Sequence, residues 1–124
     1  MKKETLDWLD RAEEHLKAAS VLLEGALSAQ CVFFCQQAME MLLKSIWIER
    51  AEEGLPPRTH DLVSLAQELA LPLSEEQLAF LRELSEQYTP TRYADVAIEY
   101  SLETAEDYYR RMERLFSWLR RLLN

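Results

Sequence analysis

The segment FFCQQAMEMLLK, residues Phe33 to Lys44, is apolar around most of a helical circumference and polar along a single row. An α-helix that is apolar on several sides is typical of the centre of a folded domain, where neighbours cover it all round. The polar exceptions are Gln36, Gln37, Glu40 and Lys44. Three of them follow one another at steps of four, so they share one helix face, and a glutamate four residues before a lysine favours an ion pair. The segment predicts a central helix with a narrow polar stripe.

Apolar or small residues also recur at steps of three and four on both sides of this segment, which indicates further amphipathic helices. The chain contains only two glycines and four prolines, the residues that most disfavour helix interiors. The expected helices are residues 4–24, residues 28–51, a short helix after Thr59, a helix that Ser74 opens and that continues through Tyr88, and a final helix opened by Ser101. We therefore predict an all-α fold, an antiparallel up-and-down bundle of four longer helices and one short helix. The 124 residues contain no linker-like run, so residues 1–124 are expected to form a single domain.

Capping residues mark the expected helix ends. Gly25 is predicted to end the first helix in the left-handed conformation, and Ser28 and Thr59 are predicted to cap the next two helices. Ser74 and Gln77 have the spacing of a capping box.

Charge and apolar patterning exclude several classes of function. The formal net charge of −8 argues against a surface that attracts nucleic acid over long range. Positive charge gathers near the end of the chain, where it also complements the dipole of a terminal helix, at Arg110, Arg111, Arg114, Arg120 and Arg121. The acidic residues that follow Lys3 are unlike a secretory signal, and polar residues interrupt the longest apolar run, so no membrane association is expected.

Cys31 and Cys35, four residues apart in an apolar run, are expected to be buried thiols in a reducing cytoplasm.

The sequence contains few residues that could bind a metal or a cofactor. The two histidines and two cysteines are too few and too badly spaced for a zinc site, so no metal and no cofactor are predicted. A glycine-rich phosphate loop is absent from the sequence.

Two polar islands remain as candidates for chemistry. The first is PPRTHDL, Pro56 to Leu62, and the second is PTRYAD, Pro90 to Asp95. Each places an arginine shortly after a proline-stiffened turn and a carboxylate three residues beyond the arginine. A purely structural explanation is open for both, as a helix start in the first and as an Arg92–Asp95 pair above a packed Tyr93 in the second.

These islands, together with the central helix, resemble the HEPN domain family, named for higher eukaryotes and prokaryotes nucleotide-binding. The resemblance is carried, in order, by WLDRAEEHLKAASVLLE at Trp8 to Glu24, FFCQQAMEMLLK at Phe33 to Lys44, PPRTHDLVSL at Pro56 to Leu65 and YTPTRYAD at Tyr88 to Asp95. It implies a helical bundle that commonly forms a homodimer and a role with nucleotides or RNA. It also implies a possible partner, a small nucleotidyltransferase with which such proteins form toxin and antitoxin pairs.

Many HEPN toxins are metal-independent ribonucleases that use an arginine and a histidine separated by four to six residues. Counted from Arg92, that histidine would stand at Ala97, Ile98 or Glu99. The alkyl groups of Ala97 and Ile98 cannot exchange protons, and the carboxylate of Glu99 would repel an RNA phosphate. Arg58 and His60 have one residue between them and do not match the motif either. No catalytic residue is therefore assigned, and the sequence favours a protein that is not an enzyme.

Three interpretations stay open. In the first, the chain binds a nucleotide, RNA or a nucleotidyltransferase without cleaving RNA, through Arg58, His60, Asp61, Arg92, Tyr93 and Asp95. In the second, it is a ribonuclease with displaced groups, in which Arg92 holds phosphate and His60 exchanges the proton. In the third, it is a dimeric interaction scaffold without a nucleotide site, and the stripe of Gln36, Glu40 and Lys44 sets the register of a helix pair.

Overall fold

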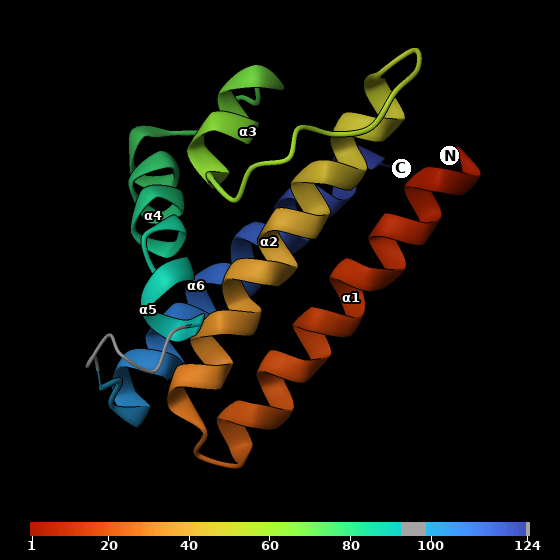
Figure 1. Ribbon diagram of the computed structural model, residues 1–124. Helices are drawn as coiled ribbons and strands as arrows, with labels where there is room; N and C mark the ends of the chain where they lie inside the picture. The colour runs from red at the N-terminus through yellow and green to blue at the C-terminus, as the bar shows by residue number, and fades with distance from the viewer. Residues whose placement is uncertain (93–98, 124) are drawn as a thin grey trace.

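The computed structural model describes residues 1–92 and 99–123, and no β-strand occurs among them. The elements are α1 (Lys3–Glu24), α2 (Ser28–Arg50), α3 (Leu62–Glu68), α4 (Glu75–Ser85), α5 (Tyr88–Arg92), α6 (Leu102–Arg120) and a terminal 3₁₀ turn, η1 (Arg121–Leu123). The all-α class is confirmed, with a second short helix, α5, in addition to the single short helix expected. In Figure 1, α1 and α2 run side by side, α6 lies behind α2, and α3, α4 and α5 follow one another along the other flank.

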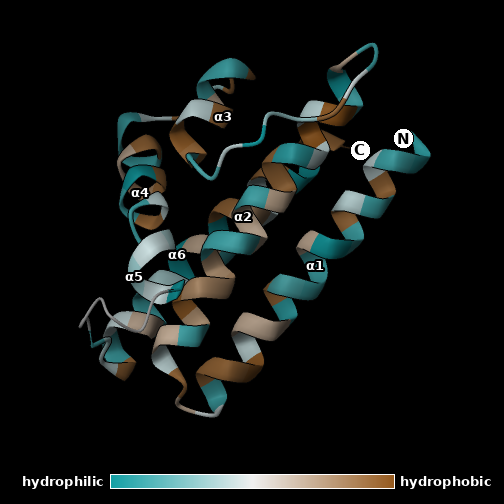
Figure 2. Cartoon of the chain, viewed as in Figure 1, coloured by the Kyte–Doolittle hydropathy of each residue, from teal (hydrophilic) through white to brown (hydrophobic). Residues whose placement is uncertain are grey.

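The central helix predicted from the sequence is α2, which contacts every other described helix. Its core residues include Met39, Leu42 and Leu43, all without solvent exposure. By contrast, α1 alternates bands of apolar and polar residues, as Figure 2 shows, because one of its sides faces water. Cys31 and Cys35 are free, buried thiols on α2, as expected. None of the described helices is both long enough and apolar enough to cross a bilayer.

The turn between α1 and α2 corrects two expectations. The left-handed residue is Ala26, with φ of 58°, and not Gly25. The Leu27 N–H bonds the Leu22 carbonyl at 2.9 Å and the Ala26 N–H bonds the Leu23 carbonyl at 3.0 Å, which is the Schellman arrangement with its left-handed position one residue after the C-cap. Leu27 is the N-cap of α2, and Ser28 makes no capping hydrogen bond.

The later helix starts follow the sequence more closely. Ser74 and Gln77 form the predicted capping box, and the Ser101 hydroxyl caps α6 by accepting the Thr104 N–H. The prediction for Thr59 was wrong, because Asp61 caps α3 while the Thr59 hydroxyl accepts the Asp61 N–H one step earlier.

The fourth helix was expected to continue to Tyr88, but α4 ends at Ser85 and Tyr88 begins α5. Pro90 was expected to lie in a connection and is instead the third residue of α5, where proline is tolerated because the first amides of a helix have no partner within it. The break between α4 and α5 turns the chain so that Tyr88 and Arg92 approach α2.

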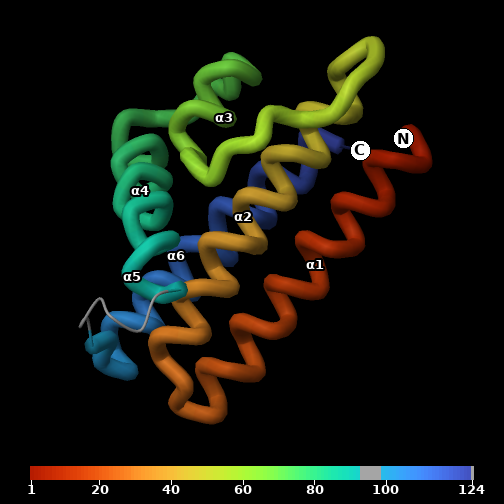
Figure 3. The backbone as a smooth tube through the Cα atoms, viewed as in Figure 1, coloured from red at the N-terminus to blue at the C-terminus, as the bar shows by residue number. Residues whose placement is uncertain are grey.

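The connection from α2 to α3 positions the candidate site. Figure 3 shows this segment, residues 51–61, doubling back along α2 before α3 begins. His60 thereby lies beside Glu40, ten residues before the end of α2, which corresponds to about 15 Å of helix.

Candidate functional site

The polar stripe of α2 is buried inside the chain. The exposed fractions of Gln36, Glu40 and Lys44 are 0%, 2% and 6%. Such burial is costly for charged groups unless they are paired and hydrogen-bonded. The Lys44 ammonium lies 3.0 Å from Glu40 Oε2, which is the ion pair that the spacing predicted.

The second oxygen of Glu40 receives two further contacts. Gln36 Nε2 donates to Glu40 Oε1 at 3.2 Å, and His60 Nδ1 lies 2.8 Å from the same oxygen. The Gln36 amide oxygen accepts from Gln37 Nε2 at 2.6 Å. Among the described residues no buried side-chain nitrogen or oxygen lacks a partner, so the stripe forms a satisfied network.

His60 is held by both its backbone and its ring. Its carbonyl oxygen accepts from Gln36 Nε2 and from the Ser85 hydroxyl, each at 3.2 Å, which ties the connection to α2 and to α4. A carboxylate can only accept hydrogen bonds, so Nδ1 of His60 carries the proton that faces Glu40. In the neutral imidazole, Nε2 is then the free acceptor. It has no hydrogen-bond partner among the described residues, and the His60 side chain is 50% exposed.

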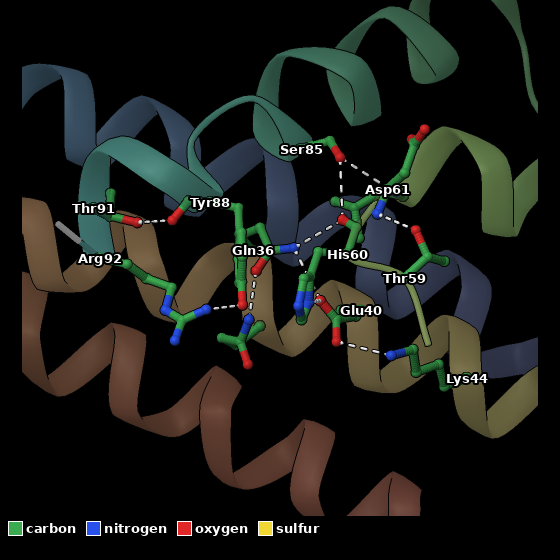
Figure 4. A network of polar contacts seen from close by, with 12 residues as sticks. Gln36, Glu40, Lys44, Thr59, His60, Asp61, Ser85, Tyr88, Thr91 and Arg92 are labelled. Atoms are coloured by element: carbon green, nitrogen blue, oxygen red, sulfur yellow. Dashed lines mark hydrogen bonds and ion pairs between the residues drawn. The ribbon is translucent and has the colours of Figure 1, made fainter. Parts of the chain in front are cut away.

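Tyr88 connects this histidine to Arg92. The Tyr88 and His60 rings stack with centroids 3.8 Å apart and planes inclined by 19°. The Arg92 guanidinium carbon lies 4.8 Å from the centroid of the Tyr88 ring, and Arg92 also donates a hydrogen bond to the Tyr88 hydroxyl. Figure 4 shows the Tyr88 ring between the Arg92 guanidinium and the His60 imidazole.

We call His60, Tyr88, Arg92 and the underlying Glu40 the His60 site. It combines a guanidinium, which suits the planar fork geometry of phosphate recognition, with an imidazole that can donate or accept a proton. The three outer groups come from two segments far apart in the sequence, and the buried carboxylate comes from a third. Such an arrangement can bind an anion and can also exchange a proton with it.

The remaining predicted residues have other places. Asp61 Oδ1 accepts the N–H groups of Val63 and Ser64, so its carboxylate caps α3. Arg58 is exposed and makes no ion pair or hydrogen bond with the part of the chain that the structure describes. Tyr93 and Asp95, both predicted to bind the ligand, lie outside the described residues.

The burial of the stripe also corrects the scaffold interpretation in one respect. Gln36, Glu40 and Lys44 cannot set the register of a partner helix, because the chain's own connection already covers them and His60 uses the Glu40 carboxylate. They support the His60 site from below.

The sequence did not identify two residues that contribute to the His60 site. Ser85 supports the His60 carbonyl and accepts the Leu62 N–H at 3.0 Å, and nothing in its local sequence indicates this. Tyr88 was assigned only to a helix face, although its position four residues before Arg92 is the spacing at which helical side chains meet.

Similarity to known proteins identifies the type of domain. A model of the HEPN domain matches residues 5–122. The crystal structure of TT1696 from Thermus thermophilus superimposes with a TM-score of 0.83 and 25% sequence identity, over 97% of this chain and 98% of that one. The crystal structure of ST0689, described as an archaeal HEPN homologue, gives a TM-score of 0.78 and 25% identity over the full length of both chains. No curated protein matches the sequence.

Proposed function

This chain belongs to the HEPN domain family, and from that premise we propose that it binds the phosphate of a nucleotide or of RNA at the His60 site. The observation that carries the proposal is the alignment of Arg92 and His60 on either side of the Tyr88 ring. The Glu40 carboxylate, itself held by Lys44, fixes the imidazole, so little side-chain freedom is lost when an anion arrives. Charge-assisted hydrogen bonds from a guanidinium are suited to phosphate oxygens.

The proposed function is binding without cleavage. Metal-free cleavage of RNA requires one group to remove a proton from the attacking hydroxyl and another to protonate the leaving oxygen. The His60 site has one imidazole, whose Nδ1 is engaged by Glu40. Loss of one acid–base group lowers a rate by ~10²–10⁴-fold.

Binding is tested with a fluorescent oligoribonucleotide and with AMP, comparing the wild type with Arg92→Gln and His60→Ala. Arg92→Gln is expected to raise Kd about tenfold or more, because it removes a charge-assisted contact. His60→Ala is also expected to raise Kd, because it removes the ring that stacks on Tyr88. Lys17→Gln is the matched control, since Lys17 is exposed on α1 and makes no ion pair among the described residues. Equal affinities of the wild type and Arg92→Gln for the oligoribonucleotide would contradict the proposal.

One observation favours a second candidate, a metal-independent ribonuclease. His60 is far from Arg92 in sequence but only one ring away from it in space, and its Nε2 is available as a base. In this function Arg92 holds the scissile phosphate and His60 exchanges the proton. The discriminating experiment incubates labelled RNA with the homogeneous protein in the presence of a chelator.

Intact RNA supports binding alone. Cleavage that disappears in both His60→Ala and Arg92→Ala, but persists in Lys17→Gln purified in parallel, supports the ribonuclease. Cleavage that survives in all variants comes from a contaminant.

We also propose a homodimer and a cytoplasmic toxin–antitoxin-like pairing with a small nucleotidyltransferase. Family membership supports both, and several large apolar side chains remain exposed on the single chain: Leu6, Val21, Leu27, Leu55 and Leu102. Sedimentation that finds only a 14.6 kDa species at micromolar concentration would contradict the dimer. The identity of the neighbouring reading frame, followed by co-purification with its product, tests the pairing.

A further inference from the structure

A second concave site lies between α4 and α6, and it shares no residue with the His60 site. The cavity measures about 350 Å³, at the lower end of the range for small-molecule pockets. Residues of α4, α6 and the start of η1 line it, chiefly Phe80, Arg111, Arg114, Leu115, Trp118 and Arg121. The last five follow α6 and its extension at successive steps of three, one, three and three, so they lie along one side of the helix.

The arginines of this pocket divide into one that is engaged and two that are available. Arg111 is committed to the protein, with its guanidinium carbon 4.5 Å from the centroid of the Phe80 ring and an ion pair of 3.3 Å to Glu83. Arg114 and Arg121 are exposed and make no ion pair or hydrogen bond with the described residues. Arg121 is the C-cap of α6, where it complements the helix dipole, and both guanidinium groups remain available to an anion.

The other residues of the lining form no ion pair with Arg114 or Arg121. Glu76 and Gln77 complete the cavity at the first turn of α4, and Glu76 makes no ion pair with the arginines. The positive end of the α4 dipole lies at this turn, where Glu75 and Glu76 offset it, so the attraction for an anion comes from the arginines.

The pocket also has an aromatic wall. Arg111 covers the Phe80 ring, which is only 4% exposed, whereas the Trp118 indole remains half-buried and accessible. A tryptophan face binds flat rings by stacking, which contributes about 1–3 kcal/mol for a nucleic-acid base. The site therefore combines phosphate-binding groups with a platform for one ring.

We propose that this pocket binds a nucleoside phosphate, with the phosphate on Arg114 and Arg121 and the base against Trp118. A cavity of about 350 Å³ accommodates one nucleotide and not a helical nucleic acid. Because the pocket and the His60 site have no residue in common, the proposal for either site can be contradicted while the proposal for the other stands.

Calorimetric titration with AMP, inorganic phosphate and adenosine tests the proposal, using the double variant Arg92→Gln, His60→Ala to remove both outer groups of the His60 site that the proposed function uses. AMP is expected to bind more tightly than either fragment, because only AMP engages both the arginines and the indole. Adding Arg114→Gln and Arg121→Gln is expected to raise Kd for AMP about tenfold or more. The matched control is Arg110→Gln, since Arg110 lies on the same helix, outside the pocket, and pairs with Glu106.

A second readout follows Trp118 alone. In a Trp8→Phe, Trp47→Phe variant, AMP is expected to quench the remaining tryptophan fluorescence. Where this variant does not fold, the calorimetric titration alone tests the proposal. The proposal is overturned if the double variant Arg92→Gln, His60→Ala shows no saturable AMP binding, if Arg110→Gln weakens binding as much as the pocket substitutions, or if inorganic phosphate binds as tightly as AMP.

Discussion

Glu40 receives contacts from three side chains while only 2% of it is exposed, so this one carboxylate joins folding to the candidate chemistry. Its pairing with Lys44 compensates the burial of two charges, and its contact with His60 selects the imidazole tautomer. Removing it disturbs both roles together.

Glu40→Ala is expected to lower the free energy of unfolding by about 3–5 kcal/mol, because the Lys44 ammonium is left buried without a partner. Urea denaturation followed by circular dichroism measures the change. Glu40→Leu combined with Lys44→Met is the matched control and should cost less than Glu40→Ala alone, since no isolated charge remains. If the double variant is the less stable of the two, the pairing is not the reason for the loss.

His15 supplies a pH dependence of stability at the same scale. Burial lowers the pKa of His15 below its ordinary value of 6.5, the nearby Arg11 charge lowers it further, and Glu14 and Glu40 oppose the shift. Below pH 6.5 the unfolded chain therefore binds the proton more readily than the folded one. Stability contributed by the neutral His15 is present above this value and is lost as the pH falls through the folded pKa.

The prediction is that the wild type loses more stability than His15→Gln between about pH 7.5 and about pH 5. Urea denaturation of both proteins at the two pH values gives the comparison. Carboxylate titration affects both proteins alike, so the difference isolates His15. Parallel pH profiles would show that the imidazole is not protected from protonation.

At the scale of elements, the helix starts show how short polar patterns act. The Ser74 hydroxyl accepts the Gln77 N–H at 3.1 Å, and Gln77 Oε1 accepts the Ser74 N–H at 2.9 Å. These bonds satisfy amides that have no partner within the first turn of α4. Because the Glu76 end of the proposed nucleotide pocket belongs to this turn, the cap also shapes that pocket.

Ser74→Ala is expected to destabilise the protein by about 1 kcal/mol, the usual effect of losing an N-cap. Ser117→Ala, in an exposed position within α6, is the control and should leave stability unchanged or slightly raised, because alanine has the higher helix propensity. Thermal unfolding distinguishes the two, and equal effects at both positions would remove the cap as the cause.

Among the elements, the connection of residues 51–61 has the largest consequence for function. Its course back along α2 brings His60 to Glu40, and the break between α4 and α5 brings Tyr88 to His60. Each segment alone is a polar loop or a single turn of helix. The site exists because both end against the same side of α2.

For the whole molecule, α2 is the common neighbour of all the described helices, and one core cluster runs through the bundle. Truncation of a buried α2 side chain is therefore expected to disturb the packing of α2 against several of its neighbouring helices. The expected consequence is unfolding in a single cooperative transition.

Leu42→Ala is expected to cost about 2–5 kcal/mol, because Leu42 is fully buried and its removal leaves a cavity. Tryptophan fluorescence and circular dichroism should report the same shifted urea midpoint. Leu55→Ala is the control, since Leu55 is 74% exposed and its loss should change stability by less than about 0.5 kcal/mol. Separate transitions for the two probes would argue against a single cooperative core.

The sequence by itself determined the helical class, the central place of residues 28–50, the Glu40–Lys44 pair and the caps at Ser74 and Ser101. These features depend on spacings of three and four residues or on a capping residue, and such local interactions act within one helix. The misplaced ends at Gly25 and Thr59 were off by one or two residues, because neighbouring polar or small residues compete for the same capping position.

Only the tertiary structure decided that the polar stripe lies inside the chain and that the Tyr88 ring lies between His60 and Arg92. The residues concerned are separated by 20 positions between Glu40 and His60, and by a further helix pair before Tyr88. Contact at that separation depends on the path of two connections around α2, and periodicity within a helix contains no information about that path.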